Sequence, residues 1–147
     1  MKDMTNLMLI PVPKEHVDLL WDGASAALAK ALPTAHGKFT IADIYNGLMS
    51  DMYVLWLVME EGEVVAAMTT RIVQYPQRRT LAIDWVGGTR MSEWLPMFVR
   101  ARKDHARKNQ CTALEGYGRR AWGRWLAKYG WEPDYIAYKM ELDDVGR

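Results

Sequence analysis

The sequence predicts one α/β (α+β) domain with a mixed, mostly antiparallel sheet of about six to seven strands and about four helices. Three observations lead to this prediction. The chain has 147 residues, 50% of them hydrophobic, which suits a single domain over 1–147 with one core. Apolar residues recur with helical spacing in some segments and with strand spacing in others. Three of the expected strands follow one another directly, as in an antiparallel meander.

The first half of the chain contains two expected helices before the meander. A strand at 7–12 ends at Pro13, which opens a helix with one apolar stripe: Val17, Leu20, Trp21, Ala24 and Leu28. A shorter helix follows and closes before Asp51. The meander then comprises strands at 53–59, 64–73 and 80–86, which are joined by turns rich in charged residues, Gly or Pro.

The second half alternates helices with strands. Gly87 and Gly88 are expected to end the third strand of the meander, and a long amphipathic helix then runs to about Lys108. A strand at 112–117 follows it. The last helix is expected to end at Gly130 in a left-handed conformation, and the segment from Tyr135 to Leu142 alternates like a final strand.

Composition excludes several classes of site. A single cysteine, Cys111, rules out an internal disulfide and is expected to be a small buried residue. Three histidines, His16, His36 and His105, lack the spacing of metal ligands, so we expect no metal. The first residues do not resemble a secretory signal, and no apolar run is long enough to cross a bilayer. We therefore expect a cytoplasmic protein without membrane contact.

Basic residues gather in one segment of the chain. Two acidic residues, Asp104 and Glu115, oppose nine basic ones: Arg100, Arg102, Lys103, Arg107, Lys108, Arg119, Arg120, Arg124 and Lys128. Such a segment attracts anions, either a phosphate-bearing cofactor or a nucleic-acid backbone. The alternative is two solvated helix faces whose arginines lie over apolar neighbours, and it is slightly favoured. Nucleic acid is therefore not the expected partner.

Arginines close to tryptophans also indicate a docking surface. Arg119, Arg120 and Arg124 lie near Trp122 and Trp125 in the sequence. Arginine and large aromatic residues are enriched at the centres of protein interfaces. This cluster would suit a protein partner or a second copy of the chain.

The order of elements resembles the GNAT (N-acetyltransferase) superfamily over nearly the whole chain. The segment from Trp125 to Trp131, with Gly130, resembles the aromatic-x-x-x-x-Gly-aromatic end of the last helix in that superfamily. A second set of residues resembles a pattern in small GNAT-like proteins of tailed bacteriophages: Trp85, Val86, Gly87, Gly88, Trp94, Gly118, Arg119, Trp122 and Gly130.

The resemblance implies an acetyl-CoA site at the start of the long helix. In the superfamily, acyl-CoA lies where two parallel strands splay apart, and its pyrophosphate binds the free N–H groups of that helix. The matching residues here are Gly87, Gly88, Thr89, Arg90, Met91 and Ser92. The glycines would allow phosphate to approach, and Arg90 would pair with it. The usual signature loop is absent, and the alternative is a plain turn with a helix cap.

The same resemblance implies an acid and a base for acetyl transfer. The family's tyrosine falls on Leu126, so Tyr117 at the end of its strand is the substitute acid. Asp84 is the candidate base, since the neighbouring Trp85 could desolvate it and raise its pKa. The alternative for Asp84 is an exposed strand aspartate.

Two functions follow from the resemblance. One is an acyl-CoA-dependent N-acetyltransferase with a degenerate cofactor loop. The other is a catalytically inactive GNAT-like phage protein, a virion component or a host-interaction protein that keeps the scaffold and binds a protein partner. The latter would work in the host cytoplasm or in the virion.

Overall fold

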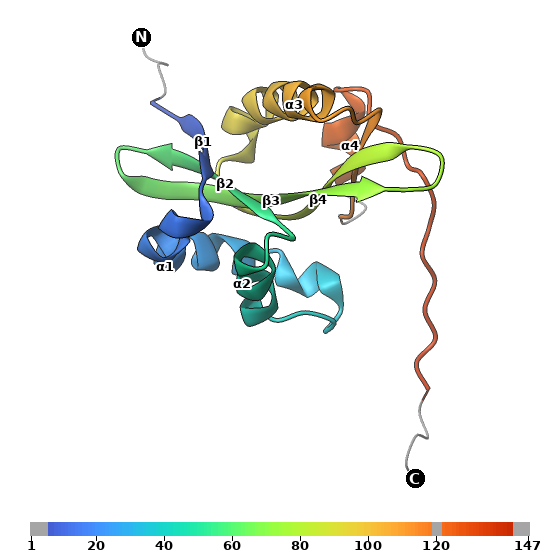
Figure 1. The fold of residues 1–147 in the computed structure, drawn as a ribbon, viewed down its shortest axis with the longest axis horizontal. Coiled ribbons are helices and arrows are strands. Elements are labelled where there is room, and N and C mark those ends of the chain that lie inside the picture. Colours follow the sequence, from blue (N-terminus) through green and yellow to red (C-terminus); the bar gives the residue numbers. More distant parts are fainter. Residues whose placement is uncertain (1–5, 119–121, 143–147) are drawn as a thin grey trace. The chain divides into compact units, whose positions relative to one another are not determined.

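The computed structural model describes residues 6–118 and 122–142. Within the first range, it describes only the backbone of residue 34. The chain divides into two compact units, Met1–Tyr117 and Gly118–Arg147, and each unit is described by itself. The larger unit contains the sheet and α1 to α3, and the smaller one contains α4 (Figure 1). A single domain over 1–147 stays a prediction.

The sheet of the larger unit has five strands in the order β1-β2-β3-β4-β5. Their bounds are Met8–Val12, Val54–Glu60, Glu63–Gln74, Arg79–Gly88 and Ala113–Gly116. The first three pairings are antiparallel and β4 pairs with β5 in parallel. The prediction of a mixed, mostly antiparallel sheet is confirmed. The predicted six to seven strands are wrong for the residues that the structure describes, which form five.

Two layers of helices cover the sheet of this unit. Helices α1 (Val17–Ala29) and α2 (Ile41–Met49) lie on one face, and α3 (Met91–Lys108) lies on the other (Figure 1). Short 3-10 helices, Lys14–His16 and Leu32–Ala35, precede and follow α1. Because parallel strands need a long crossover connection, α3 is what allows β5 to pair beside β4. The first three helices start and end close to their predicted positions.

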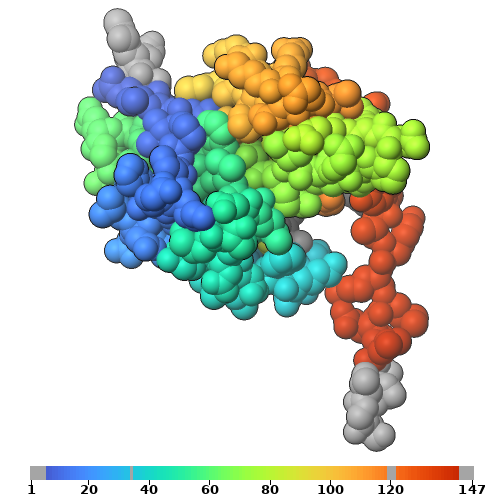
Figure 2. Space-filling view, viewed as in Figure 1, coloured from blue at the N-terminus to red at the C-terminus, as the bar shows by residue number. Residues whose placement is uncertain are grey.

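The second helix, α2, starts with a capping box. Thr40 and Asp43 form a capping box, in which the Thr40 N–H donates to Asp43 Oδ2 at 2.8 Å and the Asp43 N–H donates to Thr40 Oγ1 at 3.4 Å. Such a cap satisfies N–H groups that the helix itself leaves unpaired. In the space-filling view the atoms of α1, in blue, and α2, in teal, form one continuous surface (Figure 2).

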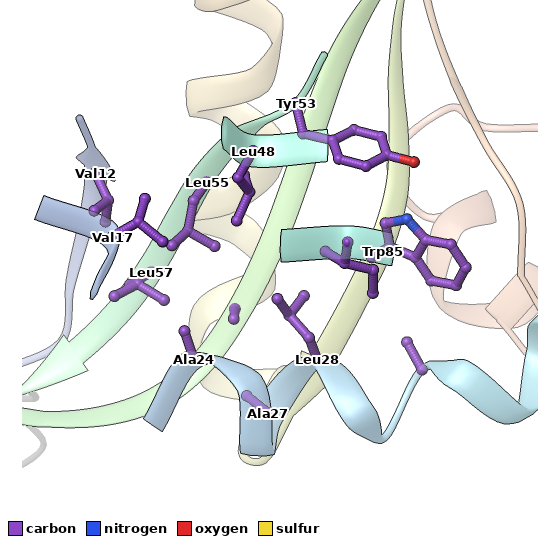
Figure 3. Packing of buried hydrophobic residues seen from close by; sticks show 13 residues of the cluster. Val12, Val17, Ala24, Ala27, Leu28, Leu48, Tyr53, Leu55, Leu57 and Trp85 are labelled. Atoms are coloured by element: carbon purple, nitrogen blue, oxygen red, sulfur yellow. The ribbon is translucent and has the colours of Figure 1, made fainter. Parts of the chain in front are cut away.

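The main core lies between the sheet and this pair of helices. Its fully buried residues include Ala24 and Leu28 of α1, Ile44 of α2, and Leu55 and Leu57 of β2. Figure 3 shows Ala24 and Leu28 of α1 reaching toward the sheet strands, with Tyr53 and Trp85 at one end of the cluster. The alternation of β2 therefore sends its leucines to the α1 and α2 side.

The glycine doublet forms the last two residues of β4, which ends at Gly88, at the predicted doublet. Gly87 pairs with Ala67, and Gly88 pairs with Ala66. A Cβ atom on Gly87 would collide with the carbonyl oxygen of Ala27 in α1, and one on Gly88 would collide with the backbone of β3. Gly88 also has φ of 142°, which a side chain would disfavour. Close packing on both sides therefore requires glycine at the end of this strand.

In the smaller unit, α4 (Trp122–Ala127) ends as predicted. Gly130 has φ of 88°, and its N–H donates to the Ala127 carbonyl at 3.2 Å. The Trp131 N–H donates to the Leu126 carbonyl at 3.2 Å. This is the left-handed glycine cap of a helix C-terminus.

The predicted final strand from Tyr135 to Leu142 is wrong. These residues form no strand, and all of them are exposed. Lys139 and Glu141 form an ion pair at 2.8 Å along one side of the segment. Alternation alone does not make a strand, because a strand is stable only when a neighbour accepts its hydrogen bonds. No strand in the described part of the chain pairs with this segment.

Two further expectations can be compared with the structure. Cys111 is buried and free, as predicted. In residues 6–118 and 122–142, no helix combines the length and apolar character that a bilayer crossing requires.

Candidate active site at the end of the parallel strand pair

The parallel pair of β4 and β5 ends before β4 does. Its last paired residues are Ile83 and Gly116, and β4 continues to Gly88. Over 85–88, β4 pairs with β3 on one side, and no described strand pairs with its other side. Backbone N–H and C=O groups on that side are therefore available to an extended ligand. This open edge lies directly before the start of α3.

Asp84, the candidate base, is held by Arg71 of β3. Arg71 Nε donates to Asp84 Oδ2 at 2.7 Å, and Nη2 donates to Oδ1 at 3.1 Å. The Asp84 side chain is 11% exposed, so the alternative of an exposed strand aspartate does not apply. Asp84 raises the pKa of Arg71, chiefly through these hydrogen bonds. Asp84 is therefore one half of a two-point ion pair and not a free base.

Glu115 of β5 is a second carboxylate at this site, and the sequence analysis did not select it. Three hydroxyl groups donate to it: Thr80 Oγ1 at 2.9 Å, Tyr75 Oη at 2.8 Å and Tyr117 Oη at 3.1 Å. Glu115 pairs in register with Ala82, two residues before Asp84. The available signal was a lone carboxylate in an otherwise uncharged strand, which we interpreted only as part of a charge count.

Tyr117, the candidate acid, lies at the end of β5 and is 55% exposed. Besides its bond to Glu115, it is close enough to Arg71 for their charges to interact. The structure therefore brings Asp84 and Tyr117 to the same end of the β4–β5 pair, and it adds Arg71 and Glu115. This group of four residues is called the polar cluster below.

Arg90, the predicted phosphate partner, is already bound to two carboxylates. It is the N-cap residue of α3, with φ of 59°. Its Nη1 donates to Glu60 at 2.6 Å, while Nε and Nη2 donate to Glu93 at 2.9 and 2.8 Å. Hydrogen bonds from Arg90 are the main reason that the pKa values of both carboxyls are lowered. Bonds to Glu93 and then Glu60 raise the pKa of Arg90.

The rest of the predicted loop offers few free groups. The Thr89 N–H donates to the Val65 carbonyl at 3.0 Å, and the Trp94 indole donates to the Thr89 carbonyl at 2.8 Å. No side chain caps α3, so Met91 and Ser92 contribute first-turn N–H groups. These amides lie beside Arg90 with its two carboxylate partners, a group with one net negative charge.

These observations test the fit of acyl-CoA. The open edge of β4 suits the amide-containing pantetheine arm, which is extended and hydrogen-bonds through peptide-like groups. The start of α3 suits the pyrophosphate poorly, because the negative charge of Glu60 and Glu93 opposes it. The residues therefore fit the acyl-pantetheine arm better than they fit the phosphates.

Residues of the predicted docking surface are described only in part. Arg119 and Arg120 lie outside the described residues. Within the smaller unit, Trp125 is 39% exposed and Lys128 Nζ lies 5.5 Å from the centre of its ring. Leu126, in the place of the family's tyrosine, is half-buried. In the described ranges, no three His, Cys, Asp or Glu residues are grouped to hold a metal ion.

Comparison with known proteins gives structural matches only. No family model and no curated protein matches the sequence. An aminoglycoside acetyltransferase from an uncultured soil metagenomic sample matches with a TM-score of 0.70 and 13% identity, over 93% of this chain and 99% of that one. A predicted acetyltransferase with acetyl-CoA from Clostridium acetobutylicum matches with a TM-score of 0.66 and 12% identity, over 92% and 96%.

A third match names the family. A GNAT family acetyltransferase from Staphylococcus aureus matches with a TM-score of 0.63 and 11% identity, over 94% of this chain and 100% of that one. Identities this low establish the fold and leave activity open. The resemblance to bacteriophage proteins stays a prediction. The chain has the α+β fold of the GNAT acetyltransferases.

Proposed function

We propose that this protein is an acyl-CoA-dependent N-acetyltransferase that binds the acyl-pantetheine arm along the open edge of β4. The carrying observation is that the parallel pair stops at Ile83 and Gly116 while β4 continues to Gly88. An extended ligand placed there would complete the hydrogen bonds of β4. Its reacting end would then be near the polar cluster, at the end of β5.

The polar cluster supplies groups for the transfer of an acetyl group to an amine. Acetyl-CoA, when bound, supplies a thioester carbonyl that an amine can attack. The acceptor amine must lose a proton, and the departing thiolate must gain one. Glu115 and Asp84 are carboxylates that attract a protonated amine, and the exposed Tyr117 hydroxyl is a proton donor at the strand end. Asp84 would accept a proton only after its pairing with Arg71 is loosened.

Phosphate recognition should be weak, because Glu60 and Glu93 occupy Arg90. We expect acetyl-CoA and acetyl-pantetheine, which lacks the nucleotide, to bind with similar affinity. Replacing both acids (Glu60→Gln with Glu93→Gln) frees Arg90 and removes two negative charges, and it should strengthen acetyl-CoA binding by about tenfold. Isothermal titration of both ligands against both proteins measures this.

The matched control is acetyl-pantetheine, whose affinity the double substitution should leave unchanged. Absence of heat with either ligand at about 1 mM, in a protein with a normal melting transition, would reject acyl-CoA binding. Equal strengthening for both ligands would place the effect outside the phosphate site.

Turnover tests the polar cluster separately. With acetyl-CoA and a panel of primary amines, thiol release should fall at least about tenfold in Tyr117→Phe, because the hydroxyl that serves the thiolate is lost. The control is Tyr138→Phe, at an exposed position in the smaller unit. Equal rates in wild type and Tyr117→Phe would remove Tyr117 from the mechanism and leave cofactor binding intact.

A second candidate is a scaffold that has lost catalysis and binds a protein, for example as a phage virion or host-interaction component. Two observations favour it: Arg90 is engaged by carboxylates, and Leu126 stands where the family has a tyrosine. It predicts a stable complex with a protein partner and no melting shift with acetyl-CoA. Recovery of the chain only as a free monomer from its native source would count against it.

A further inference from the structure

Arg102, in the middle of α3, is a buried cation for which residues 6–118 and 122–142 supply no hydrogen-bond partner. It is 1% exposed, and Nε, Nη1 and Nη2 are all buried and unpaired. A guanidinium has five N–H donors, and leaving them unpaired inside a protein is costly. In the described part of the chain, two aromatic rings stabilise its charge. The central carbon of the guanidinium lies 3.6 Å from the ring centre of Trp56 and 5.5 Å from that of Phe98.

Trp56 also contacts two residues that line a cavity. Its indole N–H donates to Thr70 Oγ1 at 3.0 Å, and its ring meets the His105 ring edge-on at 5.3 Å. Thr70 and His105 both line a cavity of about 430 Å³. Arg102 and the cavity therefore share one neighbour, the Trp56 ring.

The cavity has an apolar interior and a rim that leads to solvent. Leu81 and Thr70 are buried, while Met52, Val54 and Ile72 are exposed and also line it. Its volume is in the range of small-molecule sites in proteins. A ligand with a hydrocarbon body would cover these apolar side chains.

The charges around the cavity leave an excess of positive charge. Its own two charged residues are compensated: Asp51 pairs with Lys14 at 3.0 Å, and Arg71 pairs with Asp84. Burial lowers the pKa of His105, and the charge of Arg102 lowers it further, so this imidazole is neutral at pH 7. His105 lies one turn after Arg102 on α3, and it is the α3 residue that lines the cavity. Burial lowers the pKa of Arg102 itself to about 10, which still leaves it charged at pH 7.

We propose that this cavity binds a small organic monocarboxylate with an apolar body. The carboxylate would lie at His105, one helical turn from Arg102, and the hydrocarbon would lie on Val54, Ile72 and Leu81. An anion there supplies the counter-charge that Arg102 lacks, in a setting where charges interact strongly. The site uses the α3 side of β2, β3 and β4, and it does not depend on acyl-CoA binding at the open edge.

The test is a titration of the full chain with octanoate. Binding is measured by isothermal calorimetry and by the NMR signal of the Trp56 indole N–H. We expect saturable binding with a Kd below about 1 mM and a shifted Trp56 signal. Octanol and octylamine should bind at least about tenfold more weakly, since neither brings a negative charge.

Two variants locate the site. Arg102→Met should weaken octanoate binding at least about tenfold, while its control Arg100→Met, exposed on the same helix, should bind like wild type. Ile72→Trp, which fills the cavity, should block binding without touching Arg102. If Arg102→Met does not fold, the Ile72→Trp result still decides.

Three results would overturn the proposal. They are equal octanoate binding by wild type and Arg102→Met, equal binding of octanol and octanoate, and no binding by a well-folded wild type at about 10 mM octanoate. Any of them would leave Arg102 as a cation held only by Trp56 and Phe98.

Discussion

Two arginines of α3 differ in burial and in charge pairing. Arg90, at the start of α3, is partly exposed and donates to Glu60 and Glu93. Arg102, farther along α3, is buried, and its side-chain N–H groups have no hydrogen-bond acceptor among the described residues. Pairing raises the pKa of Arg90, whereas burial lowers that of Arg102. The cation that is accessible to a phosphate is thus neutralised, and the one without a counter-ion is inside.

The difference teaches that local charge counts do not locate an anion site. The basic segment that begins at Arg100 predicted attraction of anions through exposed side chains. Its most consequential member, Arg102, lies on the rings of Trp56 and Phe98 and not at the surface. The interpretation of arginines lying over apolar neighbours therefore holds for Arg102, although its face is not solvated. Three substitutions, at Trp56, Arg102 and Arg90, test the difference between the two arginines.

Removal of the ring beneath Arg102 should have the largest effect. Trp56→Ala deletes a large packed side chain, its bond to Thr70 and the π face under the guanidinium. We expect a loss of about 3–5 kcal/mol in the free energy of unfolding, measured with urea. Trp125→Ala, at a partly exposed ring of α4, is the control and should cost less than about 1 kcal/mol. Similar losses in both would mean that Trp56 is not a packing centre.

Removal of the buried charge should act in the opposite direction. Arg102→Met keeps much of the volume and removes an unpaired guanidinium, so we expect a gain of about 1–4 kcal/mol in urea unfolding. In the double variant with Trp56→Ala, the loss of unfolding free energy should be smaller than in Trp56→Ala alone, because no guanidinium is left without the Trp56 ring. Destabilisation by Arg102→Met would show that its π contacts outweigh its desolvation.

The Arg90 pairing should show as a smaller effect that depends on pH. Glu60 and Glu93 have folded pKa values below the ordinary 4.5, so their stabilising effect is present above about pH 4.5 and is lost as pH falls through the lowered values. In Arg90→Gln this loss should be absent, and its melting temperature should fall less steeply below pH 4.5 than that of wild type.

Asp104→Asn is the control for this profile, since Asp104 and Arg107 are 4.0 Å apart and largely exposed. It should keep the acid slope of wild type, because such exposed pairs contribute little. Parallel slopes in wild type and Arg90→Gln would contradict the role of the Arg90 pairing.

Much of the fold could be predicted, and the errors have physical causes. Helical periodicity placed the first three helices and the Gly130 cap, because both depend on residues close in sequence. The glycine doublet does end its strand, but the need for glycine there comes from the close approach of α1 at Ala27 and of β3 at Ala66, which the sequence does not show. The segment from Tyr135 to Leu142 alternates like a strand, but pairing depends on a neighbour that alternation does not specify.

The candidate site was predicted less completely. Asp84 and Tyr117 do lie at one end of the β4–β5 pair, as element order implied. Arg71 and Glu115 were missed because most of their partners are distant in sequence: Asp84 for the first, and Tyr75 and Thr80 for the second. Hydrogen bonds between residues so far apart in sequence leave no local pattern.

The order of the elements as far as α4 and the fold class were evident in the sequence, since they follow from periodicity, turn residues and connection length. The tertiary structure alone decided which charges are paired. Arg90 pairs with Glu60 at the end of β2, whereas Arg102, among the residues that the structure describes, contacts the rings of Trp56 and Phe98. The physical reason is that Coulomb energy and desolvation depend on distance and burial, which arise only when the chain is folded.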